Sequence, residues 1–273
     1  MKYDFAYFQK SADYVRSKID FTPEIGIILG TGCGPLADEV ENPIVIPYGD
    51  IPNFLVSTNP DHAGKLILGT LGGKKVVCMS GRFHYYEGYE FEQLTGPIRL
   101  FKLLGVQKTI VTNAAGAVNP SYKPGDIVIL KDHINFMGIA PTRGHNVDEF
   151  GRRFFDVSDM YTKALRDIAH ECASRSTLTI HEGVYMYMCG PQFETAAEIR
   201  AIHIMGGDCV GMSTVPEALT AAHCGMPLLG LSLMTNMATG VNVEKVDHNE
   251  VNATAASVEA PFREYVKDIV MHM

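Results

Sequence analysis

The chain has 273 residues, of which 46% are hydrophobic and 20% charged, and its formal net charge is -8. This length can bury a sizeable core, as one large α/β domain or two modest ones. The negative charge argues against nucleic acid or an anionic membrane as a partner, and no run approaches the roughly 18 apolar residues of a membrane span. The six cysteines are scattered without a C-x-x-C pair, which argues against a zinc or thioredoxin-like site. We therefore expect a reduced, cytoplasmic protein without a metal or an organic cofactor.

The first part of the chain predicts a helix followed by strands. Apolar residues recur at steps of three and four from Phe5 to Ile19, which is typical of an amphipathic helix. The apolar run Ile25–Leu29 predicts a buried strand, and Leu66–Thr70 with Lys75–Met79 predicts a hairpin. Further β-rich runs predict strands at Thr109–Thr112, Ile127–Leu130, Val184–Met188 and Leu228–Met234.

Helical patterns lie between several of these strands. Two are expected at about Phe91–Leu104 and about Asp159–Ala173. Others begin at capping signals, in which an N-cap oxygen precedes a carboxylate by three residues. These signals are Thr195 with Glu198, Thr214 with Glu217, and Asp247 with Glu250. Alternating strands and helices indicate an α/β fold with a largely parallel or mixed sheet between helices, and ligands of such folds gather beyond the carboxyl ends of the strands.

Two segments at expected strand ends suit an anion. Glycines in the segment 30–35 allow backbone N–H groups to close on a phosphate, although a tight structural turn explains them equally well. The segment does not fit a dinucleotide fingerprint, because Pro35 stands where the third glycine belongs, and it lacks the ending of a Walker loop. Arg82 and His84 point the same way if their segment is extended, which also suits a phosphate. A surface arginine beside a packed histidine is the alternative.

Three later strand ends suit a planar ring. Small residues in the segment 112–120 leave room against the backbone, unless they serve close packing alone. Glu194 has no evident structural use, because Glu198 has the capping role, and the neighbouring Phe193 can stack on a ring; a solvated glutamate is the alternative. The amide of Asn236 can donate to one ring atom and accept from another, although asparagine here is also a common turn former.

Four segments then resemble the trimeric purine nucleoside phosphorylases in order and spacing: GRFHYYEGY, TNAAGAVNP, GPQFETAAEIR and GMSTVPEA. The resemblance covers nearly the whole chain. It implies a single domain over residues 1–273, with a mixed central β-sheet surrounded by helices in a three-layer sandwich. It also implies a homotrimer that splits inosine or guanosine with inorganic phosphate as co-substrate.

The resemblance implies roles for individual residues. The phosphate site would be formed by Thr31, His62, Arg82, His84, the Ala114 backbone and Ser213. The ribose would meet Tyr86, Met212, His248 and Phe154, the last from a neighbouring subunit. The base would contact Gly116, Phe193, Glu194 and Asn236. The catalytic residues would be His84, Glu194 and Asn236. Thr31 stands where many members have serine, and the loop before His248 departs from the family's pattern.

The chemistry that follows from this resemblance is attack of phosphate on C1′ as the bond to purine N9 stretches. Arg82 and His84 would hold the phosphate, and Asn236 would donate to purine N7. Glu194 would accept from N1–H of a 6-oxopurine, which adenine lacks, so adenosine should be a poor substrate.

Four alternatives are weighed against this function. Methylthioadenosine phosphorylases share the fold and chemistry but generally carry aspartates where this chain has Thr235-Asn236. A hydrolytic nucleosidase would leave Arg82 and His84 without a phosphate to hold. A nicotinamide-dependent oxidoreductase is disfavoured by the defective fingerprint. A catalytically inactive binding protein is disfavoured because every expected catalytic position is filled.

Overall fold

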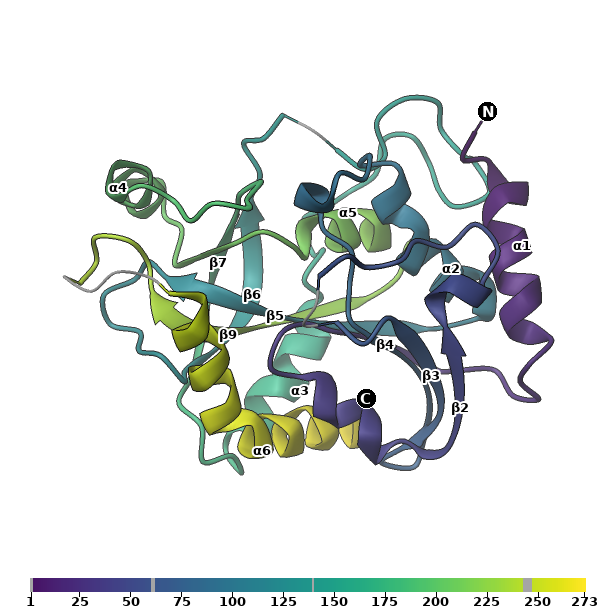
Figure 1. Ribbon diagram of the computed structural model, residues 1–273, viewed down its shortest axis with the longest axis horizontal. Helices are drawn as coiled ribbons and strands as arrows, with labels where there is room; N and C mark the ends of the chain where they lie inside the picture. The colour runs from purple at the N-terminus through teal and green to yellow at the C-terminus, as the bar shows by residue number, and fades with distance from the viewer. Residues whose placement is uncertain (1, 60–61, 139, 243–246) are drawn as a thin grey trace.

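Residues 2–59, 62–138, 140–242 and 247–273 are described by a computed structural model of the chain (Figure 1). The strands are β1 (Ile25–Leu29), β2 (Glu41–Pro47), β3 (Lys65–Leu71), β4 (Lys74–Ser80), β5 (Lys108–Ala117), β6 (Ile127–Ile134), β7 (Ile180–Tyr187), β8 (Cys209–Gly211) and β9 (Leu228–Met237). The α-helices are α1 (Phe5–Arg16), α2 (Gly96–Leu104), α3 (Lys163–Ala173), α4 (Ala196–Ile204), α5 (Val215–His223) and α6 (His248–His272). Short 3-10 helices lie at Gly34–Glu39, Tyr48–Asp50, Tyr85–Glu87 and Gln93–Thr95.

The strands form one mixed sheet in the order β2-β3-β4-β1-β5-β8-β7-β6-β9. An additional pairing between β5 and β9 joins the last five strands of this order into a closed ring. The strand β5 therefore belongs to both halves of the sheet, since β1 pairs with its first residues and β8 with its last. The expected mixed α/β sheet is confirmed, and β5 is the element that joins its open and closed halves.

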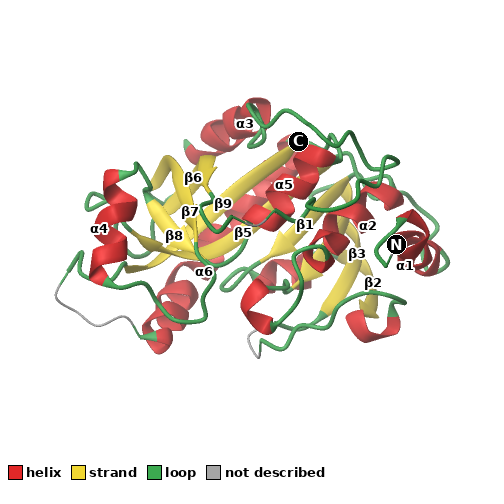
Figure 2. Ribbon diagram, turned by 90° about the horizontal axis from the view of Figure 1, so that it is seen from above, coloured by secondary structure: helices red, strands yellow, loops and turns green. Residues whose placement is uncertain are grey.

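Helices cover both faces of this sheet (Figure 1). Because strand side chains alternate between faces, Ile28 packs with residues of α1, α2 and α5, whereas Ile27 and Leu29 pack with residues of α3 and α6. A smaller cluster holds α4 against the closed half of the sheet through Ile199 and Ile202. Figure 2 shows α4 at the opposite end of the molecule from α1. None of the helices in the described part of the chain combines the length and apolar character needed to cross a bilayer.

The predicted hairpin is confirmed, and its turn has a clear cause. β3 and β4 pair antiparallel up to Leu71 and Lys74, with Gly72 and Gly73 between them. Both glycines have positive φ, 55° and 80°, as a two-residue hairpin turn of this hand requires. Two strands were not predicted from the sequence. β2 lies at the edge of the sheet and contains Pro43 and Pro47, and β8 is only three residues long.

Several predicted boundaries are wrong. The helix expected from Phe91 begins only at Gly96, because Gly96 and Pro97 form its first turn after a short 3-10 segment. The helix expected from Asp159 begins at Lys163, and the first helix ends at Arg16 rather than reaching Ile19. The strands β5 and β9 run several residues further than predicted, to Ala117 and Met237. The segments expected to be loops after them are therefore held in the sheet.

The capping signals are confirmed in two cases of three. At α4, the Thr195 hydroxyl accepts from the Glu198 N–H and the Glu198 carboxylate accepts from the Thr195 N–H, a complete capping box. At α6, the Asp247 carboxylate accepts from the backbone N–H of Asn249. At α5 the prediction is wrong, because Thr214 has a φ of 71° and its side chain makes no capping bond.

Candidate active site

A pocket of about 390 Å³ lies where β1, β4, β5 and β9 end. These strands are parallel along their pairings, so their carboxyl ends meet at one edge of the sheet. Eleven of the fourteen residues predicted from the sequence line the pocket: Thr31, Arg82, His84, Tyr86, Ala114, Gly116, Phe193, Glu194, Met212, Ser213 and Asn236. Residues from six segments of the chain, two of them in β5 and β9, are thereby brought together, and they combine anion donors with a carboxylate and an amide.

Arg82 supplies a cation to the pocket. Its side chain is buried, with 1% of the residue exposed. Its Nε and one Nη donate to the Glu217 carboxylate at 3.1 and 3.0 Å, and the other Nη donates to the backbone carbonyl of Thr112. Three of the five guanidinium N–H groups are used in this way, so two remain for a ligand in the pocket.

Glu217 has a different partner from the one predicted from the sequence. It was predicted to cap α5 with Thr214, but it lies in the interior, 4% exposed, and forms a buried ion pair with Arg82. The Thr214 hydroxyl instead accepts from the side-chain amide of Asn113 at 2.8 Å. The strained backbone at Thr214 directly follows Ser213, which lines the pocket. A carboxylate on the first turn of a helix fits a cap equally well, so only the fold could reveal this pairing.

His84 is held from two sides. Its Nδ1 lies 3.0 Å from the Glu87 carboxylate, and its ring stacks between His62 at 5.4 Å and Tyr86 at 4.6 Å between centroids. Burial lowers the pKa of His84, so the imidazole is neutral at pH 7. His62 does not itself line the pocket but lies behind His84, and Gly81 allows this approach, since a Cβ there would lie 2.6 Å from the Cβ of His62.

Glu87 is the carboxylate that binds both the ring and the backbone of His84. Burial raises the pKa of its carboxyl, but hydrogen bonds from His84 and Thr58 outweigh burial and bring the pKa down to about 2. The same carboxylate also accepts from the backbone N–H of His84 at 2.8 Å. Glu87 stands inside the GRFHYYEGY segment but was given no role from the sequence. Its spacing of three from His84 is the signal that could have identified it.

Glu194 supplies a carboxylate to the same pocket and stands just before α4. Glu194 is 9% exposed, and burial raises the pKa of its carboxyl group. Phe193 beside it is 41% exposed and lines the pocket together with Pro191. An apolar ring and a partly desolvated carboxylate therefore face the same space.

Asn236 lies near the end of β9 with its amide already oriented. Its Oδ1 accepts from the Thr235 hydroxyl at 3.0 Å, and its Nδ2 donates to the Met237 carbonyl at 3.0 Å. The second N–H of that amide remains for a ligand. Gly116 lies opposite on β5, where an added Cβ would come within 3.4 Å of the Asn236 Nδ2. The missing side chain thus keeps a flat space open beside the amide.

Comparison with known proteins identifies this arrangement. A family model described as the phosphorylase superfamily matches residues 24–270. Purine nucleoside phosphorylase 1 of Geobacillus stearothermophilus is 52% identical over 265 residues, which is 97% of each chain. The chain belongs to the purine nucleoside phosphorylases of the phosphorylase superfamily. Two crystal structures of Schistosoma mansoni purine nucleoside phosphorylase, one in complex with inosine and one with adenosine, match this chain with a TM-score of 0.94 at 42% identity. Both matches cover 100% of this chain. They cover 98% of the chain in the inosine complex and 99% of the chain in the adenosine complex.

Two further residues expected from this family are not among the residues described as lining the pocket. Phe154 is 88% exposed on the connection between β6 and α3 and is absent from the described pocket lining. His248 begins α6, but its side chain lies outside the part of the chain that the structure describes. The other predicted residues, apart from His62, line one pocket within a single chain.

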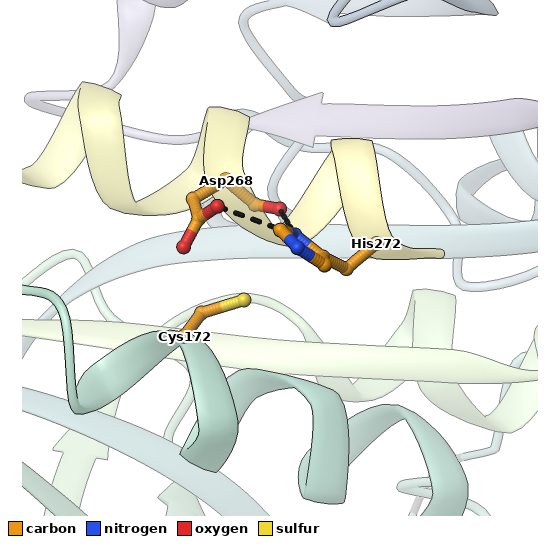
Figure 3. Close-up of side chains that lie close together, drawn as sticks. All are labelled: Cys172, Asp268 and His272. Carbon is orange, nitrogen blue, oxygen red and sulfur yellow. Dashed lines mark hydrogen bonds and ion pairs between the residues drawn. The ribbon is translucent and has the colours of Figure 1, made fainter.

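One group of possible metal ligands occurs elsewhere among the described residues: Cys172, Asp268 and His272 (Figure 3). The guanidinium of Arg175 already pairs with the Asp268 carboxylate at 2.9 Å and donates to the Cys172 sulfur at 3.2 Å. Burial raises the pKa of the Cys172 thiol to about 11, so the thiolate that a metal needs is scarce at pH 7. The group is best described as an ion-pair network that joins α3 to α6.

Proposed function

We propose that the pocket catalyses phosphorolysis of 6-oxopurine nucleosides, with inosine and guanosine as substrates and inorganic phosphate as co-substrate. The observation that carries this proposal is the set of groups gathered in one pocket. Hydrogen-bond donors of Arg82, Thr31 and Ser213 line the same pocket as Glu194 and Asn236. Family membership supports the same assignment.

In the proposed reaction, a phosphate oxygen attacks C1′ and the C1′–N9 bond breaks. The bonding electron pair stays on the purine, which then takes up a proton from water. Arg82 and His84 position the phosphate beneath the sugar, so that its negative charge stabilises the positive charge developing on the ribose. Asn236 donates to N7 and stabilises the negative charge growing on the base, an effect of about 3 kcal/mol for a single donor. The reaction as proposed draws on no metal or organic cofactor.

Glu194 sets the preference for the base in this proposal. Its carboxylate accepts from N1–H of hypoxanthine or guanine, whereas adenine presents a lone pair at N1 and leaves the buried carboxylate unpaired. A site with a buried polar group left unpaired can discriminate by about 10⁴-fold. Because a related enzyme holds adenosine in a crystal, binding alone does not test this role, and turnover must be compared.

The decisive experiment measures release of hypoxanthine from inosine with and without phosphate, and release of adenine from adenosine in parallel. Cleavage of inosine that requires phosphate, with adenosine slower by orders of magnitude, is expected. Glu194→Gln should narrow the ratio between the two nucleosides, because its amide can present either a donor or an acceptor to N1. Cleavage without phosphate would mean a hydrolase, and equal turnover of both nucleosides would remove the role of Glu194.

The same assay tests Asn236. Asn236→Ala should lower kcat by about 100-fold with little change in KM for phosphate, because the lost bond forms mainly in the transition state. The matched control is Asn249→Ala, which removes an asparagine on the exposed first turn of α6 and should leave kcat unchanged. An unchanged kcat in Asn236→Ala would contradict its role on the leaving group.

We also propose that the enzyme works as a homotrimer in which Phe154 reaches the ribose end of a neighbour's pocket. Its exposed ring in the single chain supports this, because so large an apolar side chain gains most from being covered. Sedimentation analysis should give about three chains per particle, and Phe154→Ala should raise KM for inosine more than KM for phosphate. A monomer with full activity would contradict both statements.

A further inference from the structure

A second buried arginine lies on α2, at the other end of the molecule from the Glu194 side of the pocket. Arg99 is 5% exposed, and its guanidinium carbon lies 4.8 Å from the ring centroid of Phe8 and 4.9 Å from that of Phe150. Its Nε is buried without a hydrogen-bond partner among the described residues. Burial lowers the pKa of this guanidinium, yet arginine keeps its charge at neutral pH. The side chain is therefore a largely buried cation whose Nε–H lacks an acceptor among the described residues.

Arg99 faces a cavity of about 360 Å³ between the start of the chain and the loop 141–147. Lys2, Arg143 and His145 line the same cavity, and all three are exposed at its rim. The cavity has no lining residue in common with the catalytic pocket. Its walls thus combine one buried guanidinium with two basic side chains, Lys2 and Arg143, that are open to solvent.

Two carboxylates also line this cavity, and neither neutralises Arg99. Glu90 and Glu92 are part of the lining, but no ion pair joins either of them to Arg99 in the described structure. Glu90 contributes to the raised pKa of Lys2, after the larger effect of Tyr3. Set against Lys2, Arg99 and Arg143, the two carboxylates leave an excess of one positive charge among these five groups.

We propose that this cavity is a second anion-binding site, which takes a phosphate-type oxyanion. The planar fork of a guanidinium matches two oxygens of a phosphate, and an ion held there would accept a hydrogen bond from the buried Nε–H of Arg99. The excess of one positive charge matches a singly charged phosphate. The cavity is larger than one phosphate, so inorganic phosphate and the phosphoryl group of a small monoester are the two sources to be distinguished.

The test is equilibrium dialysis of the intact enzyme against radiolabelled inorganic phosphate. Arg99→Met removes the guanidinium but keeps a long apolar side chain against Phe8 and Phe150. We expect it to bind about one phosphate fewer per chain than the wild type, with kcat and KM for phosphorolysis unchanged. Arg82→Met is the reciprocal control and should lose the phosphate of the catalytic pocket while retaining the one at Arg99. The difference at Arg99 does not depend on the proposed function, because it is measured without a nucleoside.

Equal phosphate binding by wild type and Arg99→Met would overturn the proposal. If Arg99→Met fails to fold, the rim variant Lys2→Gln with Arg143→Gln replaces it, because both side chains are exposed. This variant should weaken phosphate binding at the second site by about tenfold or more, and unchanged binding would overturn the proposal equally.

Ribose 5-phosphate is then added as competitor. Displacement of the Arg99-dependent phosphate at lower concentration than unlabelled phosphate would identify a monoester as the ligand, and weaker displacement would identify inorganic phosphate.

Discussion

Arg82 and Arg99 are both nearly excluded from solvent, at 1% and 5% exposure, and both face a cavity, but their surroundings are opposite. Arg82 is neutralised by Glu217 and donates to a backbone carbonyl. Arg99 lies against two phenylalanine rings and has no carboxylate partner among the described residues. The first arginine is satisfied before any ligand arrives, whereas the second is not.

The difference has an energetic consequence. Burial of an unpaired ion costs several kcal/mol, and a cation over an aromatic face recovers about 2 kcal/mol at most when it is desolvated. The catalytic pocket can therefore stand empty between turnovers at little cost, because Glu217 balances Arg82. The cavity at Arg99 gains more from a bound anion, since that anion removes an existing penalty. The proposed catalytic pocket at Arg82 must release its product in each cycle, which a paired arginine permits. The proposed second site at Arg99 retains its anion, because the unpaired arginine is stabilised by it.

Removing each arginine in turn is the strongest test of whether the two cavities act independently. Arg82→Met should lower kcat/KM for phosphorolysis by about 10³-fold, because the donors that position and stabilise phosphate are lost. Arg99→Met should change kcat/KM by less than about twofold, because it touches no substrate. Steady-state kinetics with varied phosphate measures both. If the two variants lose comparable activity, Arg99 is coupled to the catalytic pocket and the two regions are not independent.

Glu217→Gln tests the partner that distinguishes the two arginines. The substitution keeps the size of the side chain but leaves Arg82 as an uncompensated buried cation, which should cost about 3 kcal/mol of stability. Urea unfolding should show the loss, and added phosphate should restore more stability to this variant than to the wild type. Glu250→Gln, on the exposed first turn of α6, is the matched control. An unchanged unfolding midpoint in Glu217→Gln would mean that the ion pair contributes nothing to the fold.

The sequence predicts most of this architecture because its signals are local. The alternation of Ile27, Ile28 and Leu29 between two apolar faces, the Gly72-Gly73 turn and the Thr195 capping box each involve neighbouring residues. The edge strand β2 and the short β8 were missed because prolines and a length of three residues carry little strand signal. Whether such short or proline-containing segments form strands depends on their hydrogen bonds to neighbouring strands of the sheet.

Partners distant in sequence could not be predicted. Glu217 stands 135 residues from Arg82, and a carboxylate at a helix start has a good local explanation as a cap. Arg99 similarly belongs to an amphipathic helix, where nothing in the sequence distinguishes a buried arginine from a solvated one. Most of the residues proposed for the catalytic pocket were predicted because the family resemblance carried them, and the resemblance gave no comparable indication for Arg99.

The last expected effect is a loss of stability at acidic pH that depends on Glu87. The folded-state pKa of Glu87 is about 2, below its ordinary value of 4.5. A depressed carboxyl pKa contributes stability that is fully present above the ordinary value and is lost as pH falls towards 2, on the order of 3 kcal/mol in total. Urea unfolding midpoints of the wild type should therefore fall between about pH 5 and pH 3, and Glu87→Gln should fall less over that range. Glu149→Gln, an exposed substitution outside the pocket, should follow the wild type. Parallel pH profiles for Glu87→Gln and wild type would mean that the bonds from His84 and Thr58 do not hold this carboxylate, and that the imidazole of His84 is positioned by stacking alone.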